Sequence, residues 1–235
     1  MQKISYRSFV PIYILVLTGF LAVAIGGSRV VTVWSANAPV TERTTIVIDA
    51  GHGGVDGGAT SCTGILESQF NLEIATKLND LMHLLGIHTR MIRDTDCSVY
   101  TQGETISQKK ISDLRERVRI VNSIDDCVLI SIHQNYFSDS RYNGAQVFYP
   151  NTTGSRELSL KLQENLKNIL NPGSRRQIKK ADGIYLMQNI NCPGVLIECG
   201  FLSNPQEESS LRNPDYQRKL CSVIACTAST WLWGT

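Results

Sequence analysis

The chain has 235 residues, of which 42% are hydrophobic and 19% are charged. A chain of this length and composition can bury one sizeable hydrophobic core, which excludes an intrinsically disordered protein and favours one domain over several. Its formal net charge of +2 is too small to indicate a nucleic-acid-binding face, so no nucleic-acid partner is expected.

The first part of the chain is predicted to be an export element. Lys3 and Arg7 precede residues 9–27, which carry no charged side chain, and about 20 apolar residues span a bilayer as a helix. We therefore expect residues 1–33 to act as a membrane anchor or signal segment. Ala36 and Ala38 give the small-x-small pattern of a signal-peptidase site, but this pattern lies far beyond the apolar run, which favours an uncleaved anchor.

Strand-like and helix-like segments alternate after a polar linker at residues 34–43. In chain order we expect a strand at 44–50, a glycine-rich loop, a helix at 67–85, a strand at 87–92, a helix at 112–123, strands at 127–132 and 145–149, a helix at 154–170, strands at 184–188 and 194–199, and a helix at 214–233. This alternation predicts an α/β fold in which a mostly parallel, twisted sheet carries helices on both faces. Residues 44–235 are expected to form this single domain.

Four polar residues stand at the ends of these predicted elements. His52 follows the first strand, His133 follows the third, Glu198 closes an apolar run in the last, and Glu67 opens the first helix. The carboxyl ends of parallel strands meet at one edge of a sheet, where ligand sites gather. Two histidines and a carboxylate at that edge would form a three-ligand zinc site with an open position, and a second carboxylate could serve as a base.

Each of these residues also has a plain structural interpretation. Taken alone, His52 fits an exposed turn and His133 fits a hydrogen-bonded histidine at a strand end. Glu198 is harder to explain in this way, because an ionised carboxylate in an apolar strand is costly unless it is paired or bound to a metal. The occurrence of His52, His133 and Glu198 together at strand ends favours a metal site over coincidence.

The glycine-rich loop at residues 51–58 also permits a nucleotide-binding interpretation. It lies between a strand and a helix, and Asp94 near the next strand could contact a ribose. However, Asp56 stands where the dinucleotide motif has its third glycine, and no P-loop lysine is present. This interpretation also leaves His133 and Glu198 unexplained.

The other histidines and the cysteines are expected to be ordinary structural or surface residues. His83 and His88 lie away from the strand ends. All seven cysteines follow the export element, and an odd number excludes a complete disulfide framework in a monomer. No two cysteines have the C-x-x-C spacing, and Cys127, Cys221 and Cys226 are expected to be small core residues.

Several motifs resemble those of the zinc-dependent N-acetylmuramoyl-L-alanine amidases of the Amidase_3 family. They are VIDAGHGG at 47–54, Glu67 with Asn71 and Leu72, Arg93 with Asp96, SIHQN at 131–135 and IECGFLSN at 197–204, in a resemblance that runs over residues 44–233. The resemblance implies one zinc ion bound by His52, Glu67 and His133, with Glu198 as the catalytic glutamate. It also implies that the substrate is peptidoglycan, cleaved between N-acetylmuramic acid and the L-alanine of the stem peptide.

Further residues are predicted to contact the substrate. Arg93, Gln134 and Asn135 are the candidates within the motifs, and Gln134 departs from the small residue that is common at its position, so it could narrow the groove beside the metal. Arg115 and Arg117 could also bind substrate carboxylates, although arginines on a helix face are usually solvated ion-pair partners.

Within this family, the chain resembles the CwlD-type, germination-specific amidases of spore-forming bacteria, which are short, carry an N-terminal export segment and lack separate wall-binding modules. This resemblance implies a role in spore cortex maturation through formation of muramic δ-lactam. The expected location is the wall-facing side of the membrane around the developing spore, with control by an unidentified protein partner.

Three alternatives stay open at this point. The chain could be a vegetative cell-wall amidase that acts in cell separation. It could instead be a non-catalytic wall-binding regulator on the same fold, although such a protein would be expected to have lost a ligand or the base. A glycoside hydrolase with Glu67 and Glu198 as its carboxylate pair would leave both histidines without a role.

Overall fold

The computed structural model describes residues 44–234. Its elements are β1 (Thr45–Ala50), α2 (Glu67–Leu84), β2 (Thr89–Met91), α3 (Ile106–Asn122), β3 (Cys127–Asn135), β4 (Gln146–Tyr149), α4 (Ser155–Ile169), β5 (Lys179–Lys180), α5 (Tyr185–Asn189), β6 (Gly194–Phe201), α6 (Pro205–Arg212) and α7 (Pro214–Trp233). The predicted export segment at residues 1–33 and the linker at residues 34–43 lie outside the described residues. Within residues 44–234, no helix is both long and apolar enough to cross a membrane.

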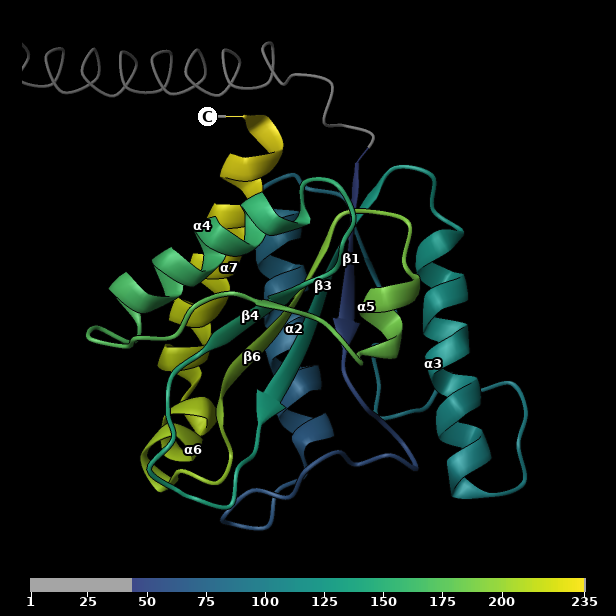
Figure 1. The fold of residues 1–235 in the computed structure, drawn as a ribbon, viewed down its shortest axis with the longest axis horizontal. Helices are drawn as coiled ribbons and strands as arrows, with labels where there is room; N and C mark the ends of the chain where they lie inside the picture. Colours follow the sequence, from purple (N-terminus) through teal and green to yellow (C-terminus); the bar gives the residue numbers. More distant parts are fainter. Residues whose placement is uncertain (1–43, 235) are drawn as a thin grey trace, which may run out of the picture. The chain divides into compact units, whose positions relative to one another are not determined.

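Within residues 44–234, six strands form one sheet in the order β2-β1-β3-β6-β4-β5. Figure 1 labels four of these strands, β1, β3, β6 and β4. The strands β2, β1, β3 and β6 are parallel to one another, β4 runs antiparallel to β6, and the short β5 is parallel to β4. The helices α2 and α3 provide the crossovers that parallel strands require. The prediction of a single α/β domain with a mostly parallel sheet is therefore confirmed.

The central strands are apolar on both faces, and helices cover both of them. Along β1, Ile46 and Ile48 belong to one core cluster whereas Val47 belongs to another, because successive side chains of a strand point to opposite faces. The first cluster contains side chains of α2, α4 and α7, and the second contains side chains of α3 and α5. Burial on both faces explains why the strands β1 and β3 have continuous apolar runs in the sequence.

One predicted strand is wrong, because residues 184–188 lie almost entirely in the short helix α5. Leu186, Met187 and Ile190 are buried in the second core cluster, and this spacing places them on one side of a helix. Leucine and methionine also have high helix propensities. An apolar run of this length cannot be assigned to a helix or a strand from its periodicity alone.

Two helices differ from the prediction at their first turns. The helix α3 begins at Ile106 rather than at residue 112, because Thr105 and Gln108 form a capping box in which each side chain accepts a hydrogen bond from the backbone N–H of the other. The helix α6 was not predicted. It begins after Asn204, whose side chain accepts hydrogen bonds from two backbone N–H groups of the first turn.

The expectations for the cysteines and for His83 and His88 are confirmed except at Cys226. Cys127 and Cys221 are buried, but Cys226 is exposed, so its prediction as a core residue is wrong. The reason is the rotation of the helix, which places position 226 on the solvent-facing side of α7. His83 and His88 are both exposed.

Candidate active site

The parallel strands bring the predicted polar residues to one edge of the sheet. His52 follows the end of β1, and His133 on β3 is paired directly with Glu198 on β6. Glu67 is the first residue of α2, which packs against β1 and β3. The site therefore lies at the carboxyl ends of the strands, as the sequence predicts.

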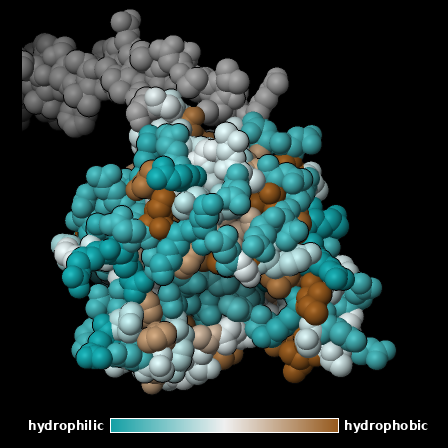
Figure 2. Space-filling model, in the orientation of Figure 1, coloured by the Kyte–Doolittle hydropathy of each residue, from teal (hydrophilic) through white to brown (hydrophobic). Residues whose placement is uncertain are grey.

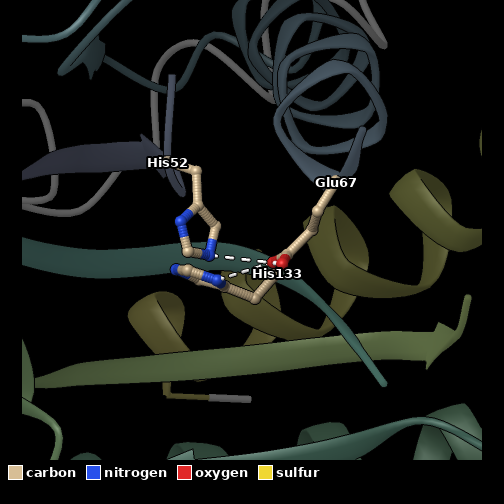
Figure 3. Close-up of side chains that lie close together, drawn as sticks. All are labelled: His52, Glu67 and His133. Atoms are coloured by element: carbon tan, nitrogen blue, oxygen red, sulfur yellow. Dashed lines mark hydrogen bonds and ion pairs between the residues drawn. The ribbon is translucent and has the colours of Figure 1, made fainter. Parts of the chain in front are cut away.

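His52, Glu67 and His133 form a cluster in which their polar atoms face one another (Figure 3). Nε2 of His52 lies 3.2 Å from Oε2 of Glu67, and Nδ1 of His133 lies 3.0 Å from Oε1 of Glu67. One ligand atom from each residue lies within 4.8 Å of the other two. Two imidazoles and one carboxylate match the donor set of catalytic zinc sites that keep a fourth position open.

The electrostatic field at this cluster favours positive charge. Burial lowers the pKa of His52, but hydrogen bonds with Asp56 and Glu67 outweigh burial and raise that pKa to about 9. Burial also acts to raise the pKa of Glu67, yet hydrogen bonds from His133 and His52 hold it well below its usual range. Carboxylates that favour bound protons also favour a bound cation. The side chains of His52, Glu67 and His133 therefore fit a divalent metal ion.

The backbone conformation around His52 allows the side chains of His52, Glu67 and His133 to lie close together. His52 has a φ of 60°, the only positive φ of a non-glycine residue within residues 44–234, and such strain typically costs about 1–3 kcal/mol and gathers at functional sites. A Cβ at Gly51 would lie 2.2 Å from Nε2 of His133, and a Cβ at Gly58 would lie 2.6 Å from Oε2 of Glu67. Glycine at these two positions is therefore required for the close approach of the side chains.

Asp56 is a residue of the site that sequence analysis missed. Its Oδ2 lies 2.9 Å from Nδ1 of His52, and its Oδ1 lies 2.7 Å from Nζ of Lys110 on α3. A carboxylate that holds the second ring nitrogen of a metal-binding histidine fixes the orientation and tautomer of the ring. The four-residue spacing from His52 was the available signal, but spacing within an irregular loop does not fix a distance.

Glu198 lies beside the cluster without belonging to it. Its Oε2 is buried and has no hydrogen-bond partner among the residues that the structure describes. Burial raises the pKa of Glu198 to about 7. A carboxyl group with a pKa near neutrality and an uncommitted oxygen is suited to accept and return a proton.

The predicted substrate contact Arg93 is enclosed by the protein. It is 3% exposed. Its guanidinium donates hydrogen bonds of 2.8–3.0 Å to four backbone carbonyls, those of Ala50, Gly51, Ser68 and Thr95. These contacts tie the end of β1 to the start of α2 and favour a structural role for Arg93 over direct contact with a substrate.

Arg117 is also buried, which corrects the expectation of a solvated arginine on a helix face. It is 2% exposed and forms ion pairs with Asp49 and Asp113. Its Nη2 donates a hydrogen bond of 2.7 Å to the backbone carbonyl of His52. The side chain therefore supports the loop of the cluster, whereas Arg115 is exposed.

Gln134 and Asn135 continue β3 beyond His133. The register of β3 against β6 shifts between His133 and Asn135. Gln134 is 3% exposed. Its backbone N–H donates to Oε1 of Glu67, and its Nε2 donates to Oδ1 of Asn71. Gln134 thus supports the carboxylate of Glu67, whereas Asn135 is half-buried at the end of the strand.

Comparison with known sequences identifies the family of this chain. The profile of the Amidase_3 family, described as N-acetylmuramoyl-L-alanine amidase, matches residues 46–227. The germination-specific N-acetylmuramoyl-L-alanine amidase of Bacillus subtilis is 40% identical over 181 residues, which cover 76% of this chain and 76% of that protein. The amidase LytC of B. subtilis is 31% identical, and the match covers 77% of this chain and 34% of LytC.

A solved structure of the CwlD amidase from Clostridioides difficile in complex with the GerS lipoprotein is 38% identical to this chain. It superposes with a TM-score of 0.77 and covers 81% of this chain and 99% of that one. The fold and the cluster define a hydrolytic enzyme with a His-Glu-His site at the end of a parallel sheet. The chain belongs to the Amidase_3 family and is an N-acetylmuramoyl-L-alanine amidase, an enzyme that acts on peptidoglycan.

Proposed function

We propose that this amidase binds one zinc ion through His52, Glu67 and His133 and that Glu198 moves the proton during catalysis. The observation that carries the proposal is the convergence of three donor groups within 4.8 Å. Beside them lies Oε2 of Glu198, which has no hydrogen-bond partner within residues 44–234. The bond cleaved is the amide between the lactyl group of N-acetylmuramic acid and the L-alanine of the stem peptide.

Zinc, when bound, supplies Lewis-acid chemistry that polarises the amide carbonyl and lowers the pKa of water. Glu198 takes a proton from the attacking water as the water oxygen bonds to the carbonyl carbon. The carbon–nitrogen bond then breaks, and Glu198 gives the proton to the leaving nitrogen of L-alanine. Asp56 keeps His52 oriented through the 2.9 Å contact with Nδ1.

A pair of glutamine variants tests these assignments. Glu67→Gln should lower the zinc content, because it removes a charged ligand, as should His52→Ala or His133→Ala. Glu198→Gln should keep zinc and lower turnover by at least about 10²- to 10⁴-fold, because it removes only the proton-transfer group.

The matched control is Glu73→Gln, the same substitution at a side chain of α2 that is 51% exposed. This variant should keep both zinc and activity. Zinc loss in Glu198→Gln together with full zinc in Glu67→Gln would reverse the roles assigned to the two glutamates.

We also infer that the physiological role lies in the spore cortex, where removal of stem peptides leads to muramic δ-lactam. The support is similarity to the germination-specific amidase of B. subtilis and to the CwlD amidase of C. difficile. The alternative is a vegetative amidase that acts in cell separation. A deletion strain should form spores that lack muramic δ-lactam in their cortex, and a normal δ-lactam content would contradict the spore role without affecting the enzyme class.

We further propose that the enzyme acts on the wall-facing side of the membrane, held there by residues 1–33, and is controlled by a protein partner. The support is the uncharged run at residues 9–27, similarity to a probable cell wall amidase of Staphylococcus epidermidis, and the lipoprotein in the solved CwlD complex. Fractionation of cells that express the full chain should find it in the membrane fraction together with any stable partner. Recovery from the cytosol alone would contradict this location.

A further inference from the structure

A groove rich in positive charge lies next to the active site, along the edge of the sheet formed by β4 and β5. Its volume is about 930 Å3, and it is lined by the loop after β3 and by the segment between α4 and β5. Four cationic side chains line it, those of Arg141, Arg175, Arg176 and Lys179. Among the lining residues only Asp139 carries a carboxylate, and it is paired with Arg141 at 2.7 Å. The groove therefore has an excess of positive charge.

Arg176 connects this groove with the active site. Its Nε donates to the carbonyl oxygen of Asn143 and its Nη1 to Oε1 of Gln146, both at 2.7 Å, and its guanidinium lies 4.5 Å from the ring centre of Phe201. Gln146 is paired with Glu198 across β4 and β6. Residues paired in this way project from the same face of the sheet with their Cβ atoms about 5 Å apart. Arg176 is therefore anchored one side chain away from Glu198.

The guanidinium of Arg176 is anchored but keeps binding capacity. Within residues 44–234, Nη2 has no hydrogen-bond acceptor, and no carboxylate forms an ion pair with Arg176. Burial lowers the pKa of Arg176, and the more distant carboxylates of Glu207 and Glu198 only partly offset this effect. A partly desolvated arginine with a free edge is suited to bind a carboxylate, because such a ligand would supply the missing counter-charge.

We propose that Arg176 binds a free carboxylate of the stem peptide and gives this enzyme a preference for acidic stem peptides, with Arg175 and Lys179 adding attraction at longer range. This inference rests on the proposed function, which places the amide of L-alanine at the cluster beside Glu198. The glutamate that follows L-alanine carries the nearest carboxylate, and one extended residue spans about 3.3–3.6 Å. The face drawn in Figure 2 is mainly hydrophilic with apolar side chains in small groups, which suits a polar peptide better than a lipid surface.

Two muropeptides that differ in one group test the proposal. Both are disaccharide peptides, and the glutamate after L-alanine carries a free α-carboxylate in one and the α-amide in the other. The zinc-loaded full chain should cleave the carboxylate form with a kcat/KM about 10- to 100-fold higher, the range expected for a hydrogen bond between charged groups. Arg176→Gln should lose this preference mainly through a higher KM for the carboxylate form, and Arg176→Lys should keep part of it.

The matched control is Arg156→Gln, which removes an exposed arginine of α4 outside the groove and should keep the full preference. Equal cleavage of both muropeptides by the wild type would overturn the proposal, as would a preference that survives in Arg176→Gln. An equal loss on both substrates in Arg176→Gln would also overturn it, because that result indicates a purely structural role. A wild-type enzyme that cleaves neither muropeptide nor intact peptidoglycan would contradict the proposed function instead.

Discussion

Arg117 links the hydrophobic core to the loop of the metal site, and its loss should strongly destabilise the fold. Its guanidinium pairs with Asp49, lies 2.6 Å from Asp113 and donates to the carbonyl of His52. Arg117→Met keeps much of the apolar stem but removes the counter-charge of Asp49, which is 1% exposed. Within residues 44–234 the carboxylate of Asp49 then keeps a side-chain hydrogen bond from Ser131. Removing one partner of a buried ion pair lowers the free energy of unfolding by about 3–5 kcal/mol. This is a large share of the total free energy of unfolding of a typical domain, which is about 5–15 kcal/mol.

Urea denaturation of the zinc-free protein, followed by circular dichroism, measures this cost without a contribution from metal binding. The control is Arg119→Met, two residues along the same helix. Arg119 is exposed and pairs with Glu116 in solvent, so its removal should leave the unfolding midpoint almost unchanged. The double variant Asp49→Asn/Arg117→Met should recover part of the loss, because the charge of Asp49, the more deeply buried of the two carboxylates that pair with Arg117, is then removed as well. A free energy of unfolding for Arg117→Met within about 1 kcal/mol of wild type would refute this reasoning.

Three further predictions concern the active site. Asp56→Asn should weaken zinc binding about 10- to 100-fold in a competition titration with a chelator, whereas Asp215→Asn, at a carboxylate that is 83% exposed, should not. Chelation should abolish peptidoglycan hydrolysis and added zinc should restore it; indifference to chelation would favour the glycosidase alternative. In a pH–rate profile, kcat should fall as the pH drops through the pKa of Glu198, because protonation removes the base. Burial raises that pKa to about 7, and a bound dication lowers it from this value. The residual activity of Glu198→Gln should not show this fall in kcat at low pH.

The sheet and the cluster could be predicted because their sequence signals are local. The runs that form β1 and β3 are buried on both faces, so they are continuously apolar and easy to recognise. Parallel pairing then brings together whatever follows those strands, which is why His52, His133 and Glu198 could be assigned to one site before their distances were known.

The features that could not be predicted depend on contacts between distant segments. Arg117 resembles a solvated helix arginine until its ion pair with Asp49, 68 positions away, is known. Asp56 acquires its role only through the fold of an irregular loop. The groove at Arg176 likewise forms between the loop after β3 and the segment before β5, and neither segment has a regular pattern.

Mass spectrometry of the products released from purified peptidoglycan tests the central claim most directly. The zinc-loaded enzyme should release stem peptides that begin with L-alanine and carry a free amino group, and it should leave glycan strands whose muramic acid lacks a peptide. Glu198→Gln should release neither product at a comparable rate. New reducing sugar ends with the stem peptides still attached to muramic acid would contradict the assignment of this chain as a zinc amidase.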